Sequence, residues 1–410
     1  MLTHTHSHIA AHYLYLEEKY GAHNYHPLPV VLEKGEGVFV WDVDGKRYFD
    51  FLSGYSAINQ GHCHPRIINK LIGQATKLTL TSRAFHSNIL GEYAQYITSF
   101  FGYDKVLPMN TGVEAVETAI KLARRWGYAV KGIEENKARI VVCENNFHGR
   151  TSTVISFSSD PSAYTRFGPF MPGFDFVPFN NLVSLEKAFQ DKNITAFLLE
   201  PIQGEAGVVV PEEGYLKAVR SLCTEYNVLL IADEIQTGLA RTGKMLAIDH
   251  EGVHADILIL GKALSGGTIP VSAVLAHDDV MLLIKPGEHG STYGGNPLAC
   301  AVAIESLQVL KDEQMAENAE AMGELFRQEL RELNSPLIKT VRGKGLLNAI
   351  VVNHTNPEAA WNLCIELRDN GLLAKPTHGD KIRFAPPLLI TKEQIHECVD
   401  IISHSIKVLN

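Results

Sequence analysis

Two chemically reactive side chains come directly after two apolar runs near the middle of the chain. Asp233 follows the run Val228–Ala232, and Lys262 follows the run Ile257–Gly261. Short apolar runs rich in β-branched residues, closed by turn residues, are typical of buried parallel strands. Because ligands bind outside the carboxyl ends of such strands, we expect this carboxylate and this amine at one edge of one sheet.

Such a pair suits one cofactor in particular. Pyridoxal phosphate needs a lysine amine that joins its aldehyde and a carboxylate that keeps its pyridine nitrogen protonated, so that the ring accepts electrons. Strands of many α/β proteins also end in Asp or Lys without holding any cofactor. The residues around the two strand ends therefore decide between these interpretations.

Both strand ends lie inside longer motifs. The stretches Ala232–Gly243 and Leu260–Gly267 resemble the signature of the class III aminotransferases, at the distance expected in that family. The resemblance covers nearly the whole chain. It implies an α/β protein of fold-type I, with a large domain around a mainly parallel seven-stranded sheet and a smaller α+β domain. It also implies pyridoxal 5'-phosphate as cofactor, with Lys262 and Asp233 as catalytic residues.

Composition excludes several classes of partner. The 410 residues, of which 45% are hydrophobic, can form a large core and usually divide into two domains. A net charge of −9 argues against nucleic acid, and no apolar run approaches the ~20 residues that cross a bilayer. The six scattered cysteines favour a cytoplasmic protein with reduced thiols. We expect His4, His6 and His8 to form a solvated tail rather than a metal site.

Apolar patterns also predict the elements that position the motifs. Strands and helices alternate between about residues 61 and 297, which indicates βαβ units. The expected strands are Arg139–Cys143, Thr153–Phe157, Ala196–Glu200, Val228–Asp233, Asp256–Leu260 and Val271–His277. The later expected elements are helices at Ala299–Leu310 and Met315–Leu333, strands at Leu346–Val352 and Lys381–Phe384, and a last helix capped by Thr391.

A hairpin is predicted over Val38–Asp50, where an Asp-Gly pair forms the turn. A lone hairpin is rarely stable, so we expect it to pack on the smaller domain. The predicted domains are therefore an N-terminal segment, 1–55, a large cofactor-binding domain, 56–300, and a small C-terminal domain, 301–410.

The start of one helix is a candidate phosphate site. Asn110–Ala115 opens a predicted helix, whose free N–H groups and dipole favour an anion. The family resemblance assigns cofactor binding to Thr111, Gly112, Val113, Phe147, Asp233, Gln236, Lys262 and Thr292. It implies that Phe147 stacks on the ring and that Gln236 bonds the phenolic oxygen. Thr292 then reaches the phosphate of a neighbouring subunit, which implies a homodimer with shared active sites.

Further stretches are similar to the family members that act on ornithine. They are His23–Pro29, Ser53–His62, Leu107–Gly112, Pro286–Thr292 and Leu372–Asp380. The resemblance implies L-ornithine and 2-oxoglutarate as substrates, with transfer of the δ-amino group. The implied substrate-binding residues are Tyr25, Tyr55, Arg150, Glu205 and Arg383.

Each of these residues has an implied role. Tyr25 contacts the α-amino group of ornithine, Tyr55 shapes the pocket, and Arg150 binds the α-carboxylate with its planar fork. Glu205 masks Arg383 by an ion pair until 2-oxoglutarate arrives. The alternative for such a pair is an ordinary surface salt bridge, which contributes ~0–1 kcal/mol.

Three alternatives are less favoured by the sequence. Tyr25 and Tyr55 disfavour the same chemistry on acetylornithine or 4-aminobutyrate. A nicotinamide-dependent dehydrogenase is disfavoured because no G-x-G-x-x-G motif follows an early strand. An inactive scaffold is disfavoured because Lys262 and Asp233 are both present.

Overall fold

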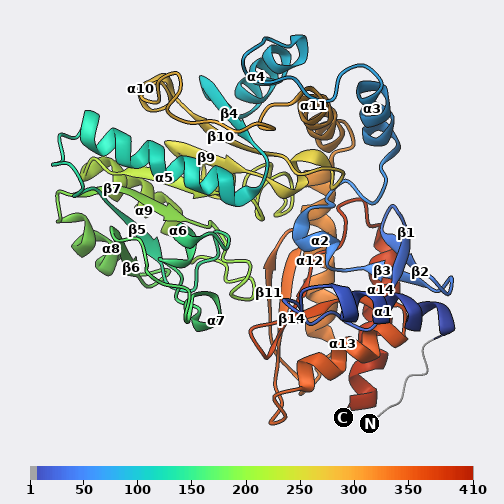
Figure 1. Cartoon of the computed structure of the whole chain (residues 1–410). Helices are drawn as coiled ribbons and strands as arrows, with labels where there is room; N and C mark the ends of the chain where they lie inside the picture. The colour runs from blue at the N-terminus through green and yellow to red at the C-terminus, as the bar shows by residue number, and fades with distance from the viewer. Residues whose placement is uncertain (1–6, 410) are drawn as a thin grey trace.

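A computed structural model describes residues 7–409 and contains three β-sheets (Figure 1). The largest has the strand order β4-β10-β9-β8-β7-β5-β6. Its strands are β4 (Lys105–Met109), β5 (Arg139–Cys143), β6 (Phe174–Val177), β7 (Ile194–Leu199), β8 (Leu229–Asp233), β9 (Ile257–Leu260) and β10 (Ser272–Ala276). Only β10 runs antiparallel to its neighbours. The predicted mainly parallel seven-stranded sheet is therefore confirmed.

Helices cover both faces of this sheet. The five inner strands, β5, β7, β8, β9 and β10, are buried along nearly their full length, as expected for strands enclosed on two sides. Alternate strand residues pack against α5 (Gly112–Ala129) on one face. The other residues pack against α8 (Leu182–Phe189) and α9 (Tyr215–Glu225).

One predicted strand is wrong. The stretch Thr153–Phe157 contains instead the short helix α6 (Ser152–Ile155), whose start is capped by Thr151. The Thr151 hydroxyl accepts a hydrogen bond from the N–H of Val154 at 3.4 Å, so the local cap overrides the β-branched composition. The Val154 and Ile155 side chains are buried nonetheless.

The C-terminal part contains an antiparallel sheet of order β11-β12-β15-β14. Its strands are β11 (Ile338–Lys344), β12 (Leu347–Val352), β14 (Lys375–Thr377) and β15 (Lys381–Phe384). The helices of this part are α11 (Pro297–Asp312), α12 (Met315–Glu332), α13 (Ala359–Asp369) and α14 (Lys392–Leu409). Thr391 does cap α14, because its hydroxyl accepts from the N–H of Gln394. The predicted smaller α+β domain is confirmed.

The N-terminal segment packs beside these C-terminal elements (Figure 1). It comprises α1 (His8–Tyr20), β1 (Leu32–Glu36), β2 (Phe39–Asp42) and β3 (Arg47–Asp50). Strands β2 and β3 form the predicted hairpin, and β13 (Leu372–Leu373) pairs with β3 in parallel. The domain boundaries stay predictions, and the one after residue 300 falls inside α11.

The remaining described elements are short or lie on the outside of the sheets. They are α2 (Ser53–Ser56), α3 (Pro65–Ala75), α4 (Asn88–Phe101), α7 (Pro161–Tyr164), α10 (Asp278–Met281), and the 3₁₀ helices η1 (Ala247–Glu251) and η2 (Lys262–Ser265). Within residues 7–409, every helix is too short or too polar to cross a membrane. The same residues contain no group of three His, Cys, Asp or Glu side chains that could hold a metal ion. His4 and His6 lie outside the described residues.

Candidate active site

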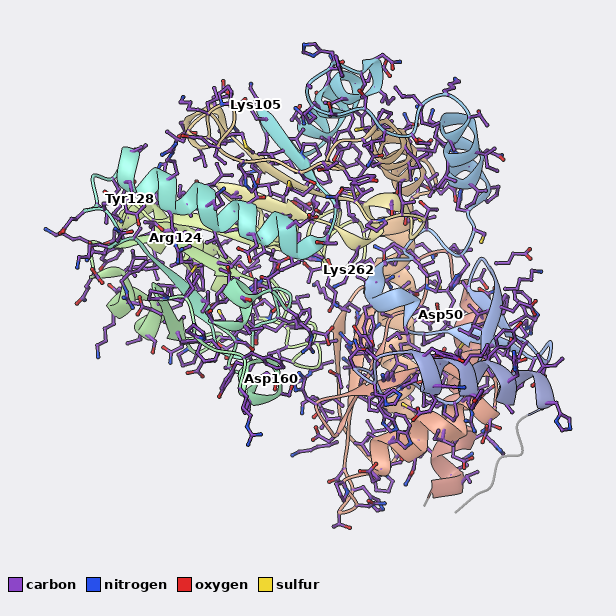
Figure 2. The ribbon with its side chains drawn as sticks, viewed as in Figure 1. Asp50, Lys105, Arg124, Tyr128, Asp160 and Lys262 are labelled. Atoms are coloured by element: carbon purple, nitrogen blue, oxygen red, sulfur yellow. The ribbon has the colours of Figure 1, made fainter. Side chains whose placement is uncertain are left out.

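The carboxyl ends of five parallel strands meet at one edge of the large sheet. They deliver Gly112 after β4, Phe147 after β5, Glu200 after β7, Asp233 at the end of β8 and Lys262 after β9. Together with Val113, His148, Gly149, Ile235, Gln236 and Thr237, they line a cavity of about 180 Å³. Figure 2 shows Lys262 in the middle of the molecule, between this sheet and the C-terminal elements.

Lys262 is half-buried and begins η2 with a φ of 43°. Burial lowers the pKa of its ammonium group, and the carboxylates of Glu205 and Asp233 oppose that shift without cancelling it. A lysine with a lowered pKa is more often the neutral amine, which is the form that attacks carbonyl groups and accepts protons.

Asp233 is 4% exposed and is held by two hydrogen bonds. Its Oδ2 lies 2.7 Å from Nδ1 of His148, and its Oδ1 accepts the N–H of Ile235 at 3.1 Å. Burial alone would lower the pKa of the His148 ring, but the hydrogen bond and charge of Asp233 outweigh burial and raise it. These two hydrogen bonds fix the orientation of the Asp233 side chain at the cavity.

The start of α5 has the geometry of an anion site. The Thr111 hydroxyl accepts from the N–H of Glu114, and the Glu114 carboxylate accepts from the N–H of Thr111 at 2.8 Å. In the described chain, the N–H groups of Gly112 and Val113 find no acceptor and are available to a phosphate. A Cβ at Gly112 would come within 2.9 Å of Cδ1 of Ile235, so a larger residue there would require the Ile235 side chain to shift.

These groups fit pyridoxal phosphate. An amine, a buried carboxylate, a pair of free N–H groups and the aromatic ring of Phe147 all border one small cavity. Lys262 would be joined to the cofactor's aldehyde, Asp233 would hold the ring nitrogen, and Gly112 and Val113 would bind the phosphate.

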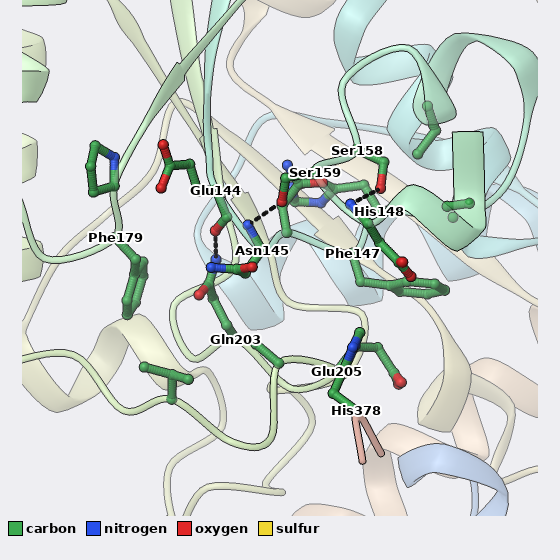
Figure 3. A pocket seen from close by; sticks show the side chains of 18 of the residues that line it. Glu144, Asn145, Phe147, His148, Ser158, Ser159, Phe179, Gln203, Glu205 and His378 are labelled. Atoms are coloured by element: carbon green, nitrogen blue, oxygen red, sulfur yellow. Dashed lines mark hydrogen bonds between the residues drawn. The ribbon is translucent and has the colours of Figure 1, made fainter. Parts of the chain in front are cut away.

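A second cavity of about 590 Å³ adjoins the first and shares Phe147, His148 and Gly149 with it. Figure 3 looks into this larger cavity, with Phe147 and His148 from the segment after β5 and Glu205 from the loop after β7. Arg150 lines it, and its guanidinium carbon lies 5.6 Å from the centre of the Phe147 ring. The space is large enough for an amino-acid substrate beside the cofactor cavity.

Glu205 and Arg383 form a largely buried ion pair. The Nη1 of Arg383 donates to Oε1 of Glu205 at 2.6 Å, and the Arg383 side chain is 6% exposed. Gln236 donates to the same oxygen at 3.3 Å. Burial raises the pKa of the Glu205 carboxyl, but Arg383 lowers it further, to below its ordinary value. Breaking such a buried pair leaves an uncompensated charge, unlike breaking a surface salt bridge.

The other predicted residues are less enclosed. The Tyr55 ring lies 5.2 Å from the guanidinium carbon of Arg383, and Tyr55 has a φ of 62°. Such strained backbone is typical of functional sites. Tyr25 is 71% exposed. Thr292 is exposed and lines neither cavity, and the Thr111 side chain is occupied by the helix cap.

Two ionisable residues that line the small cavity were missed in the sequence. His148 lies inside the Phe-His-Gly-Arg stretch, and Glu200 ends a predicted strand, as Asp233 does. A carboxylate at a strand end was therefore a usable signal for Glu200. The position of His148 in a motif gave no indication that its ring points toward Asp233.

Comparison with known families identifies the chain. The family model described as aminotransferase class-III matches residues 20–406. The chain belongs to the class III aminotransferases. It is therefore a pyridoxal-phosphate-dependent aminotransferase, in agreement with the groups that line the small cavity.

Relatives with known names are similar over nearly the whole chain. Ornithine aminotransferase of Rattus norvegicus, named as mitochondrial, is 64% identical over 95% of this chain and 89% of that protein. The ornithine aminotransferase of Plasmodium falciparum is 55% identical over 96% of both chains.

Solved structures of aminotransferases are similar to this chain over nearly its whole length. An ornithine aminotransferase from Toxoplasma gondii, described with partial occupancy of the cofactor, has a TM-score of 0.96 and 50% identity, covering 98% of this chain and 94% of that one. An acetylornithine aminotransferase from Elizabethkingia anophelis has a TM-score of 0.90 and 59% identity, covering 97% of this chain and 99% of that one.

Proposed function

We propose that this chain transfers the δ-amino group of L-ornithine to 2-oxoglutarate. The products are glutamate and glutamate 5-semialdehyde, and the semialdehyde cyclises to pyrroline-5-carboxylate because its α-amine reaches its own aldehyde. The observation that carries the proposal is the buried Glu205–Arg383 pair beside the Lys262 cavity. The names of relatives up to 65% identical support it.

The two substrates differ in their carboxylates, which explains the use of a masked arginine. Ornithine has one carboxylate, and Arg150 at the cavity wall would bind it while Tyr25 contacts the α-amine. With its charge neutralised by Glu205, Arg383 does not compete for that carboxylate. The dicarboxylate 2-oxoglutarate needs both arginines, so Glu205 must release Arg383 when it binds.

The chain's own groups then handle the proton. When bound, pyridoxal phosphate supplies an electron sink for the carbon that loses a proton. The Nζ of Lys262 removes that proton from the δ carbon of ornithine, and in the second half-reaction it delivers a proton to the keto carbon of 2-oxoglutarate, which becomes the α carbon of glutamate. Asp233, supported by His148, maintains the charge that keeps the ring nitrogen protonated.

Acetylornithine is the second candidate amino donor, favoured by the 59% identity to the Elizabethkingia enzyme. A donor panel with 2-oxoglutarate separates the candidates. We expect ornithine to exceed N-acetylornithine and 4-aminobutyrate at least tenfold in kcat/KM, equivalent to about 1.4 kcal/mol. A preference for either other donor would overturn the substrate assignment and leave the family membership intact.

Removing the carboxylate of Glu205 should change which amine reacts. In Glu205→Ala, Arg383 is permanently free and attracts the α-carboxylate of glutamate or ornithine. We expect kcat/KM for glutamate relative to ornithine to rise about tenfold, or about 1.4 kcal/mol. Steady-state rates with each donor measure this ratio, and an unchanged ratio would show that Glu205 does not control Arg383.

We also propose a homodimer in which Thr292 reaches the partner's phosphate site. Thr292 is exposed in the single chain, and the Asn110 amide beside the phosphate site donates to Ser291 at 2.7 Å. Large apolar side chains are exposed in this region: Ile72 on α3, Leu78 and Phe85 between α3 and α4, and Tyr293 before α11. Helix α11 packs on both α3 and α4. Such exposed apolar surface is typical of subunit interfaces.

Hybrid dimers test the shared site. A Lys262→Ala chain and a Thr292→Ala chain, mixed and reassociated, should form hybrids in which one of the two sites has both intact residues. We expect activity well above the sum of the two parent dimers. A fully active monomer on size-exclusion chromatography would contradict the dimer.

For location we propose the cytoplasm. The support is chemical: Cys143, Cys223, Cys300, Cys364 and Cys398 are buried free thiols in the structure. The relatives from rat and fly are named mitochondrial, so cell fractionation decides, and recovery in an organelle would overturn this proposal.

A further inference from the structure

Glu200 is a buried carboxylate in the cofactor cavity to which the proposed chemistry gives no role. It follows β7 directly, it is 7% exposed, and it lines the same cavity as Lys262 and Asp233. A buried carboxylate without a cation paired to it is unfavourable unless hydrogen bonds compensate for the lost hydration. Its two oxygens therefore indicate what it stabilises.

Each oxygen accepts one backbone N–H, and the two donors belong to different walls of the site. Oε2 accepts the N–H of Phe147 at 2.9 Å, and Oε1 accepts the N–H of Gly204 at 3.3 Å. Phe147 supplies the aromatic ring at the cavity. Gly204 directly precedes Glu205, the residue that masks Arg383. One carboxylate thus connects the cofactor wall to the substrate-selecting loop.

The Gly204 loop is placed with little tolerance. A Cβ at Gly204 would lie 1.5 Å from the side-chain oxygen of Gln236, so its backbone is packed directly on that side chain. The loop closes through paired hydrogen bonds between Gln203 and Val209, and the Glu205 carbonyl accepts from the hydroxyl of Thr377. A shift at Gly204 therefore moves Glu205 relative to Arg383.

We infer that Glu200 is a positioning residue that holds Phe147 against the cofactor and Glu205 against Arg383 at the same time. The placement of Glu205 matters for substrate selection only if the proposed function holds. The placement of Phe147 depends on the cofactor cavity alone. The role of Glu200 requires two acceptor oxygens: a carboxylate has them, whereas an amide has one oxygen and turns an N–H₂ group toward the second N–H.

The chain offers a matched control. Glu234 is also a fully buried carboxylate at the end of a parallel strand, and it accepts from the N–H of Ile248 at 2.9 Å and from the hydroxyl of Thr237. Burial raises the pKa of both Glu200 and Glu234 to about 7. Glu234 lines neither cavity, and the cavity residue that it contacts is Thr237, through a side-chain hydroxyl. It therefore reproduces the burial of Glu200 without holding the backbone of Phe147 or Gly204.

The experiment compares Glu200→Gln with Glu234→Gln in the full-length protein. Titration of the apoprotein with pyridoxal phosphate, followed by protein fluorescence, should show about tenfold weaker binding for Glu200→Gln and less than twofold change for Glu234→Gln. The kcat/KM ratio of ornithine to glutamate should fall several-fold for Glu200→Gln only. Equal values for the two variants in both measurements would overturn the inference.

Cofactor titrations at a series of pH values give a second test of the same inference. Above pH 7 the Glu200 carboxylate accepts both N–H groups, and below pH 7 protonation removes one acceptor, since burial raises its pKa to about 7. His148, Asp233, Lys262 and Cys143 carry the titratable groups around it.

These surrounding groups are present in the wild type, in Glu200→Gln and in the shorter Glu200→Asp, so they contribute to the pH dependence of cofactor affinity in all three proteins. The difference in cofactor affinity between wild type and variant therefore reports on Glu200. Cofactor affinity of the wild type should approach that of Glu200→Gln as the pH falls from 8 to 6. A constant difference across that range would contradict the inference. If ornithine proves not to be the donor, the cofactor titrations still decide the role of Glu200.

Discussion

Replacing Lys262 with Ala is expected to lower the rate of amino transfer from ornithine by about 10⁴-fold, the upper range for a positioned proton-transfer group. The variant loses both the amine that joins the cofactor and the base that moves the proton at the δ carbon. Nothing else that lines the cavity of about 180 Å³ carries an amine. Single-turnover absorbance measurements with ornithine would give the rate.

Lys105 provides the control for this variant. It begins β4 and therefore lies at the opposite edge of the sheet from Lys262, where it pairs with Asp278 at 2.8 Å (Figure 2). Lys105→Ala should retain wild-type activity. Added methylamine should restore part of the Lys262→Ala rate by entering the space that the side chain leaves. Multiple turnovers at a near-normal rate without added amine would contradict the role of Lys262.

Asp233→Asn is expected to reduce kcat about a thousandfold, or about 4 kcal/mol. Asparagine has nearly the same shape and can still accept the N–H of Ile235, but it carries no charge to keep the ring nitrogen protonated. It also removes the negative partner of His148, which lies 2.7 Å away. Steady-state kinetics and thermal unfolding together would separate this electrostatic loss from loss of fold.

The matched control is Asp256→Asn. Asp256 directly precedes β9, at the amino ends of the strands, whereas the cavity lies at their carboxyl ends. It pairs with Arg220 at 2.7 Å. We expect this variant to lose stability rather than turnover. A loss below tenfold in Asp233→Asn, about 1.4 kcal/mol, would show that the charge of Asp233 is not needed.

The fold was most predictable where the chain is buried on both faces. Strands β8 and β9 match their predicted ranges to within one residue at each end, because continuous apolar runs and turn residues mark both ends. Strand β4 was missed because it contains Pro108 and lies at the sheet edge. Strand β6 was missed because it is a short edge strand with a charged residue in it.

Local sequence patterns predicted the site as a set of residue types, whereas its contacts came from the family resemblance or from the structure. The resemblance supplied Glu205 and Arg383 as partners, yet they are 178 positions apart and no local pattern joins them. The same limit applies to Glu200, whose partners lie 53 positions before it and four after it. Tertiary packing decides which strand ends face each other, and the periodicity of a sequence does not contain that information.

The nitrogen that leaves ornithine can be followed directly. The protein is given ornithine labelled with ¹⁵N at the δ-amine together with unlabelled 2-oxoglutarate, and the products are separated by mass spectrometry. The proposed function predicts the label in glutamate and none in pyrroline-5-carboxylate, whose ring nitrogen comes from the α-amine. With ornithine labelled at the α-amine, the label should instead appear in pyrroline-5-carboxylate and not in glutamate. Label passing into glutamate from the α position would contradict δ-amino transfer.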